Sequence, residues 1–159
     1  MTQPLLTVKD FAGSYDLTVL ATAKAELKIS DSSKDDEISL LIHQVSDAIS
    51  TICDRVFAEE TVEEVFRLHQ GRNSWRRSGG EVLQESLILR RRPVSIVNSV
   101  IEDGITVDSA EYEIDSGSGI LYRLTTDDFR CGWRANKITV NYTSGYFLLD
   151  DLPYDIEKA

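Results

Sequence analysis

A change of hydrophobic period near residue 57 constrains the fold of this 159-residue chain more than any other feature. Before it, apolar residues recur every three to four positions, which places them on one face of a helix. After it, short segments rich in Val, Ile, Tyr and Phe alternate with turn residues, as is typical of antiparallel strands. The order of these patterns predicts an α+β fold in a chain long enough for one domain.

The strongest helical pattern runs from Lys34 to Asp54. Its apolar stripe consists of Ile38, Leu41, Ile42, Val45, Ala48, Ile49 and Ile52, and the opposite face of Ser39, His43, Ser46, Asp47 and Ser50. Ser33 and Asp36 have the spacing of a capping box at its start. An Ala-rich stretch from Thr18 to Lys28 predicts a shorter helix before it. We therefore expect two helices, the second packing on its apolar face.

Seven candidate strands follow: 62–68, 86–89, 95–102, 105–107, 112–114, 120–124 and 137–142. Asp103-Gly104 predicts a tight hairpin, because such a turn needs positive φ. A second hairpin is predicted at 115–119. Its glycines look like a phosphate loop, but no helix pattern follows, so we favour a turn over a nucleotide site.

Charge is unevenly distributed in this chain, whose formal net charge is −10. An acidic surface repels a phosphate backbone, which argues against a general nucleic-acid binder. Residues 67–92 nevertheless form a basic island of seven arginines and two glutamates, a segment charge of +5 that leaves −15 for the rest. This island predicts contact with an acidic surface of another copy or partner, or else an ordinary solvated loop.

Within the island, residues 70–80 form a polar stretch that contains glycine and lacks periodicity, which predicts a loop. Trp75 lies there next to Arg76 and Arg77. Tryptophan and arginine are enriched at protein interfaces, so the stretch is either a contact site or an ordinary loop tip.

No catalytic or metal-binding pattern surrounds the two histidines, His43 and His69. Cys53 and Cys131 lack metal-ligand spacing and suggest free thiols in a reducing cytoplasm, with neither a disulfide nor a cofactor. No segment reaches the roughly 18 to 20 apolar residues of a membrane-spanning helix, and the first residues lack the pattern of an export signal. We expect a soluble, non-enzymatic structural protein.

The last ten residues, from Asp150 to Ala159, predict the start of a helix, because Pro153 suits a first turn and acids favour its positive end. About two turns are not stable alone, since isolated helices need about 12 to 15 residues. We expect this end to be held by a partner or to be the beginning of a longer element.

An ordered set of short segments carries a family resemblance. These are Lys24 before Leu27-Lys28-Ile29, the acidic segment 30–37, Ile52-Cys53-Asp54-Arg55-Val56-Phe57, Leu87-Ile88-Leu89-Arg90-Arg91-Arg92-Pro93-Val94, Asp103-Gly104, Tyr112-Glu113-Ile114-Asp115, and Val140-Asn141-Tyr142-Thr143-Ser144-Gly145-Tyr146 before Leu152-Pro153-Tyr154-Asp155-Ile156. In this order they resemble the head-tail connector (adaptor) proteins of tailed bacteriophages, over nearly the whole chain.

The resemblance implies a single connector domain over residues 1–159. It would be a small helical bundle (1–57 and 146–159, with two N-terminal helices and the start of a C-terminal one) carrying a β-rich antiparallel insertion (58–145). The family's last helix usually continues past the proline and takes part in portal docking, whereas this sequence stops at Ala159.

Members of that family form rings, typically of twelve copies, beneath the portal of the DNA-filled head. The resemblance therefore implies a virion protein of the neck, assembled in the bacterial host cytoplasm, whose partners are its own copies, the portal, and the tail or next completion protein. DNA would pass through the channel without sequence-specific binding. The predicted interface residues are Arg72, Trp75, Arg76, Arg77, Arg90, Arg91, Arg92, Pro153, Tyr154 and Ile156.

Two other classes compete with this interpretation. A head-closure or tail-terminator ring protein would serve the same particle, but such proteins are dominated by β structure, and the two predicted helices count against them. A cytoplasmic enzyme or ligand-binding domain would need a pocket that nothing in the sequence predicts.

Overall fold

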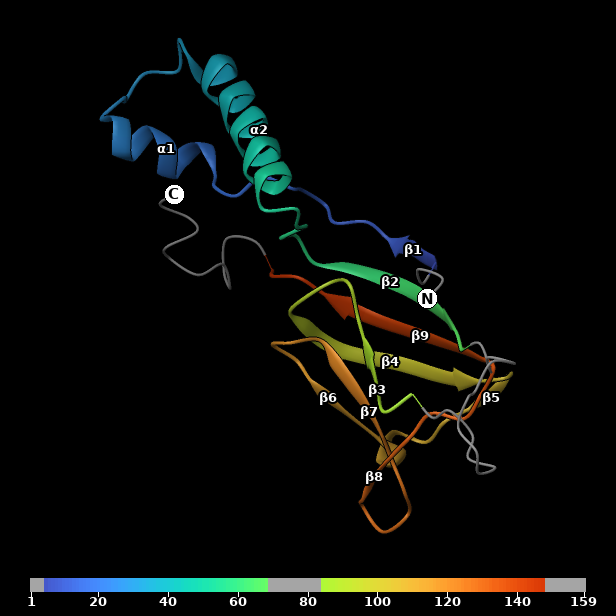
Figure 1. Cartoon of the computed structure of the whole chain (residues 1–159). Helices are drawn as coiled ribbons and strands as arrows, with labels where there is room; N and C mark the ends of the chain where they lie inside the picture. The colour runs from blue at the N-terminus through green and yellow to red at the C-terminus, as the bar shows by residue number, and fades with distance from the viewer. Residues whose placement is uncertain (1–4, 69–83, 148–159) are drawn as a thin grey trace. The chain divides into compact units, whose positions relative to one another are not determined.

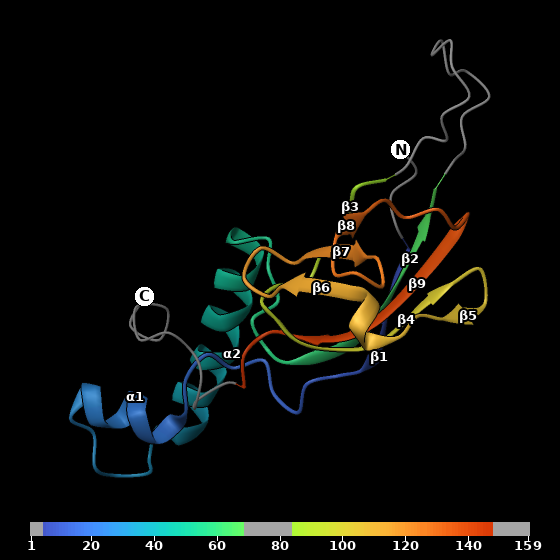
Figure 2. The same cartoon turned by 90° about the horizontal axis from the view of Figure 1, so that it is seen from below.

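The computed structural model describes residues 5–68 and 84–147. These residues form two compact units, each with its own set of elements (Figures 1 and 2). The β unit contains the described residues of 1–10 and 61–144, and the helical unit contains those of 11–60 and 145–159. Helices and antiparallel strands are thus segregated into different units, which confirms the α+β class.

Two antiparallel sheets make up the described β unit. The first contains, in spatial order, β1 (Leu5–Asp10), β2 (Glu60–Arg67), β9 (Lys137–Ser144), β4 (Val94–Glu102) and β5 (Ile105–Thr106). The second contains β3 (Ser86–Ile88), β7 (Ile120–Leu124) and β6 (Tyr112–Asp115), with β8 (Arg130–Cys131) paired to β7. A short 3-10 helix, η1 (Ser109–Glu111), precedes β6. Figure 1 shows the smaller sheet crossing the larger one.

The core of the β unit follows from side-chain alternation. Along β2 and β9 every second residue is buried, as expected where one face of a strand packs and the other meets solvent. One apolar cluster joins both sheets: Val62, Phe66, Leu87, Leu89, Val94, Val100, Val107, Leu121, Trp133, Ile138, Val140 and Tyr142. Fully burying one such side chain contributes about 1.5 to 3 kcal/mol, so this cluster stabilises the pairing of the sheets.

Both predicted hairpins are confirmed. Asp103 (φ 46°) and Gly104 (φ 94°) both have positive φ in the β4–β5 turn, as a mirror-type turn requires. The Asp103 carboxylate accepts hydrogen bonds from the backbone N–H groups of Asn136 (3.0 Å) and Lys137 (2.8 Å), and these bonds lower its pKa. The second hairpin, around Gly119, joins β6 to β7.

All seven predicted strands are present, each with ends within two residues of the expected bounds. β1 and β8 were not predicted. β1 corrects the assignment of residues 1–57 to the helical part, because Leu5–Asp10 pairs with β2 instead. Its partner lies more than fifty residues away in the sequence, so no local turn signal marks it.

The helical unit contains α1 (Leu20–Leu27) and α2 (Asp35–Ile52), which confirms the two predicted helices. The predicted capping box is absent: Lys34 occupies the N-cap position without a side-chain cap. The Asp31 carboxylate instead accepts from the backbone N–H and the hydroxyl of Ser33, one turn earlier. Three acidic residues in the first turn of α2 interact favourably with the helix dipole.

The face of α2 that packs inside the described unit is rotated from the predicted stripe. Ser46, assigned to the polar face, is buried, and its hydroxyl accepts a hydrogen bond from the Leu17 N–H (3.0 Å). Ile38 is buried as predicted, whereas Leu41 and Ile52 are 57% and 83% exposed. Only part of the stripe is therefore covered by described residues.

After β9 the chain returns to the helical unit. The Tyr146 N–H donates to the Phe57 carbonyl (2.7 Å), and Tyr146 and Ala58 form a parallel bridge. Gly145 has a φ of +108°, and a Cβ there would lie 2.2 Å from the Ala58 carbonyl oxygen, so only glycine allows this approach. The predicted C-terminal helix lies outside the described residues, and the single-domain boundaries stay a prediction.

Candidate interaction site

Arg90, Arg91 and Arg92 lie in the connection between β3 and β4, where Arg90 and Arg92 are exposed and Arg91 is half-buried. The segment then reaches Pro93 through a cis peptide bond. Of the predicted interface residues, these three are the ones that the structure describes. We refer to residues 90–92 as the arginine turn.

Two fully buried side chains hold one side of the arginine turn. The Glu64 Oε2 atom, on β2, accepts hydrogen bonds from the Arg90 N–H (3.1 Å) and from the Tyr142 hydroxyl (2.9 Å). The Tyr142 oxygen in turn accepts from the Arg91 N–H (3.2 Å). The Arg90 Nε atom lies 3.6 Å from the Glu64 Oε1 atom, which places a cation beside the buried carboxylate. Backbone donors of the turn are thus bound to the core.

The β6–β7 hairpin holds the other side of the arginine turn. The Leu89 N–H donates to the Gly119 carbonyl (2.8 Å), and the Val94 N–H donates to the Ser116 carbonyl (2.9 Å). Gly119 has a φ of +68°, and a Cβ there would lie 2.7 Å from Arg92 Cγ. A side chain at this position would displace the arginine, so glycine is required for both backbone and packing reasons.

Burial raises the pKa of Glu64, because desolvation penalises its charged form more than the hydrogen bonds and Arg90 favour it. Burial, followed by the nearby Glu64 charge, raises the pKa of Tyr142. The hydroxyl therefore stays protonated and donates at neutral pH. The arrangement fixes the backbone of a basic turn.

Glu64 was not predicted as a site residue from the sequence. The signal was present, since Glu64 shares the strand face of Val62 and Phe66, both of which are core residues. An acid at a core-facing strand position predicts a buried partner.

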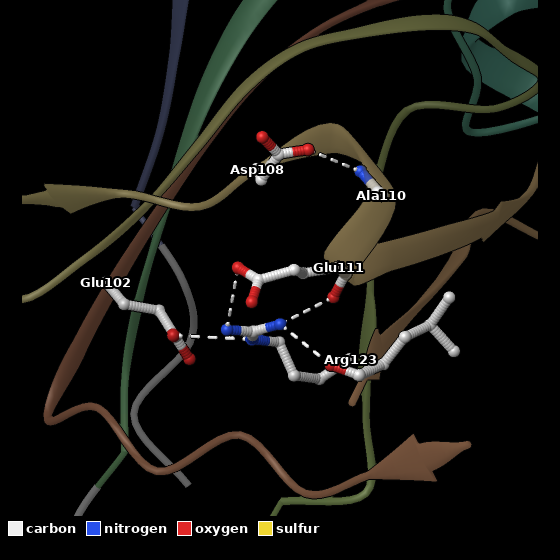
Figure 3. A network of polar contacts seen from close by, with 6 residues as sticks. Glu102, Asp108, Ala110, Glu111 and Arg123 are labelled. Atoms are coloured by element: carbon white, nitrogen blue, oxygen red, sulfur yellow. Dashed lines mark hydrogen bonds and ion pairs between the residues drawn. The ribbon is translucent and has the colours of Figure 1, made fainter. Parts of the chain in front are cut away.

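A second polar network is centred on Arg123 of β7 (Figure 3). Its guanidinium lies 3.4 Å from both Glu102 Oε2 and Glu111 Oε2 and donates to the carbonyls of Glu111 (2.7 Å) and Leu124 (2.9 Å). In the same view Asp108 caps η1 by accepting from the Ala110 N–H (2.9 Å). These contacts join β4, η1 and β7, so we assign Arg123 a structural role.

The remaining predicted interface residues lie outside the described part of the chain: Arg72, Trp75, Arg76, Arg77, Pro153, Tyr154 and Ile156. The chain on either side of residues 69–83 is described. The Leu68 N–H donates to the Asn136 carbonyl (2.9 Å), and the Trp133 N–H donates to the Gln84 carbonyl (2.9 Å). Both ends of that stretch are therefore anchored to residues 133–136.

His43 is exposed and pairs with Asp16 at 2.5 Å, while His69 lies outside the described residues. Cys53 and Cys131 are both free. Within residues 5–68 and 84–147, no group of three or more His, Cys, Asp or Glu side chains is arranged to hold a metal ion. No helix in those ranges is long and apolar enough to cross a bilayer.

Comparisons with known proteins support the fold alone. No protein-family model matches the chain, and no curated protein matches it either. Among solved structures, a similar chain comes from the neck of an empty gene transfer agent (GTA) particle computed with C6 symmetry. The likeness has a TM-score of 0.59 at 10% identity and covers 95% of this chain and 76% of that one. The present chain thus has the fold of a protein from a phage-like neck.

Proposed function

We propose that this protein is a structural component of the neck of a tailed-phage particle, where it joins the head to the tail. The observation that carries the proposal is the likeness of 95% of the chain to a chain from a GTA neck. The ordered motifs of the sequence resemble the head-tail connectors independently of that likeness. In this role the protein forms a ring beneath the portal, extends the DNA channel and catalyses no reaction.

Ring contacts join two different surfaces, because each copy meets the next in the same orientation. Opposite charges on the two surfaces set orientation and register. Residues 11–60 contain ten acidic and four basic residues, whereas residues 67–92 carry the basic island. This asymmetry supports an electrostatic contact between copies, or between this protein and the portal.

The family resemblance implies twelve copies, a number that is compatible with six-fold symmetry. The acidic excess is expected to face the channel, where it would let DNA slide without binding. The last residues, including Pro153, Tyr154 and Ile156, are expected to contact the portal.

Electron microscopy of the protein mixed with purified portal particles tests the proposal. Rings that cap the portal on its tail-facing side are the expected result. Binding to tail ends alone would instead indicate a tail-terminator protein, and addition only to portals that already carry a connector would indicate a head-closure protein. No association with portal, connector or tail would overturn the assignment to the neck.

A further inference from the structure

Four residues of the predicted apolar stripe of α2 are exposed and lie in one line along the helix. Leu41, Val45, Ala48 and Ile52 follow one another at spacings of four, three and four residues. Leu41 is 57%, Val45 53% and Ile52 83% exposed. Apolar residues at this spacing are the pattern by which a helix packs against a partner surface. We call these four residues the α2 seam.

The α2 seam lies in an acidic part of the chain. Glu37 is exposed one turn before Leu41, on the same face of the helix. From Lys34 to Arg55 the chain contains five acids and two bases, a net charge of −3, and α2 itself contains neither lysine nor arginine. An apolar surface that also carries positive charge therefore fits the seam best.

The arginine turn and the residues beside it form a surface of that chemistry. Ile88 is 62% exposed and precedes Arg90 by two residues. The aliphatic part of Arg92 lies against Gly119, since a Cβ there would come within 2.7 Å of Arg92 Cγ. Gly119 is followed by Ile120, which lies opposite Ile88 in the strand register. An exposed isoleucine thus lies close to two exposed arginines. We call Ile88, Arg90 and Arg92 the basic face.

The basic face keeps a positive charge despite the acids near it. Residues 86–101 contain no acid. Glu64, which pairs with Arg90, is fully buried, and Asp115 of β6 accepts a hydrogen bond from the Ser118 N–H (3.4 Å). The three arginines of the turn outnumber these two carboxylates even when both are ionised. Because the core and the β6–β7 hairpin already hold the backbone of the turn, little further ordering is needed on binding.

We propose that the basic face of one copy binds the α2 seam of the next copy in the ring. The inference rests on the proposed function, because a ring contact joins two unlike surfaces, and every copy of this chain carries both. In this contact Ile88 packs on the seam, and Arg90 and Arg92 face the acids of the helical unit.

Site-specific photo-crosslinking tests this contact on the full chain. Val45 is replaced by p-benzoylphenylalanine, and this chain is mixed with ¹⁵N-labelled wild-type chain in the presence of portal particles. Mass spectrometry then identifies the crosslinked peptides. The expected product joins the unlabelled residue 45 to labelled peptides that contain Ile88 or Arg92. Crosslinks only to residues 148–159 or other parts of the same chain, to the portal, or to other labelled peptides would overturn the proposal, as would the absence of any crosslink.

Two neighbouring leucines of α2 supply a matched pair of variants. Leu41 lies on the α2 seam, whereas Leu40, similarly exposed at 56%, is turned away from it by about 100° around the helix axis. Leu41→Asp should lower the crosslink yield about tenfold or more, because it places a charge in the apolar contact, and Leu40→Asp should leave the yield unchanged. Circular dichroism checks that both variants keep their helices. Equal yields would contradict the contact.

Charge reversal tests the other side of the contact. In the labelled chain, Arg92→Glu should lower the crosslink yield about fivefold or more. Arg134→Glu makes the same change at an exposed arginine outside the basic face and should leave the yield unchanged. Equal yields for these two variants would refute the proposal.

Electron microscopy of the same samples separates this contact from the proposed function. Rings on the portal without the expected crosslink would refute the contact and leave the neck function intact. No association with portal, connector or tail would refute both.

Discussion

Glu64 offers the sharpest test of how the β unit holds the arginine turn. Its side chain is fully buried and its Oε2 atom serves two donors, the Arg90 N–H and the Tyr142 hydroxyl. Glu64→Ala removes the acceptor and leaves both donors in the core. An unsatisfied buried donor costs about 1 to 3 kcal/mol, so we expect a loss of about 3 to 5 kcal/mol. That is a large part of the roughly 5 to 15 kcal/mol by which domains are stable.

Glu64→Gln separates the hydrogen bonds from the charge. The amide oxygen can still accept from both donors, and a neutral side chain avoids the desolvation cost that raises the carboxyl pKa. The variant loses the Arg90 ion pair, whose cation is partly exposed and therefore contributes little. We expect Glu64→Gln to stay within about 1 kcal/mol of wild type at neutral pH.

The contribution of Glu64 to stability depends on pH with a definite sign. The folded-state pKa of Glu64 lies above the ordinary value of 4.5, so the folded protein retains a proton that the unfolded chain releases. The stabilising contribution of this group to the free energy of unfolding is therefore fully present below pH 4.5 and is lost as the pH rises through the folded-state pKa. Wild type should lose stability relative to Glu64→Gln on going from about pH 5 to about pH 8.

Urea unfolding measures these differences, with a Trp75→Phe background so that the buried Trp133 reports on the β unit alone. Midpoints and slopes are compared at each pH. A Glu64→Gln variant as unstable as Glu64→Ala would show that the charge, not the acceptor, matters. If the free energy of unfolding of wild type instead increased relative to that of Glu64→Gln as the pH rises, the burial argument would be refuted.

Three further substitutions test single contacts by urea unfolding. Arg123→Ala should cost about 3 to 5 kcal/mol by leaving two acids and two carbonyls without their donor. Arg123→Lys should recover only part of this loss, because a lysine ammonium lacks the forked N–H donors of a guanidinium. Gly119→Ala should cost about 1 to 3 kcal/mol through positive φ and the clash with the arginine turn. Gly117→Ala in the same hairpin should be nearly neutral, because a Cβ there would meet only Asp115 Oδ1 at 3.8 Å. Ser46→Ala should destabilise the helical unit by about 1 to 2 kcal/mol, because it leaves the Leu17 N–H without its acceptor. Far-ultraviolet circular dichroism follows the unfolding of this unit, and the exposed Gln44→Ala is the control. Equal effects of a variant and its control would contradict the assigned contact.

Local sequence signals predicted the elements that local physics determines. Asp103 and Gly104 specify their turn because backbone sterics there depend on two residues. The α2 pattern specifies a helix because its period extends over five turns. β1 was missed because a strand of six residues gains its stability from a partner distant in sequence.

The arginine turn shows why site geometry was harder to predict. Its charge was visible in the sequence, but the residues that fix it come from β2, β9 and the β6–β7 hairpin. Only the fold brings Glu64, Tyr142 and Gly119 together around it. A sequence reveals which residues can form charged contacts, whereas the tertiary structure decides which of them are held in place.

The apolar stripe of α2 marks a more general limit. Apolar periodicity predicts that some surface covers a helix face, but the pattern is the same whether that surface belongs to the same chain or to another. Ile38 is covered within the described residues, whereas Leu41, Val45 and Ile52 on the same predicted stripe are exposed there. The outer face of the second sheet has the same character, since exposed Ile88 follows the core residue Leu87 along β3. For the ring proposed above, the exposed residues of a correctly predicted apolar pattern are therefore the first places to look for contacts between subunits.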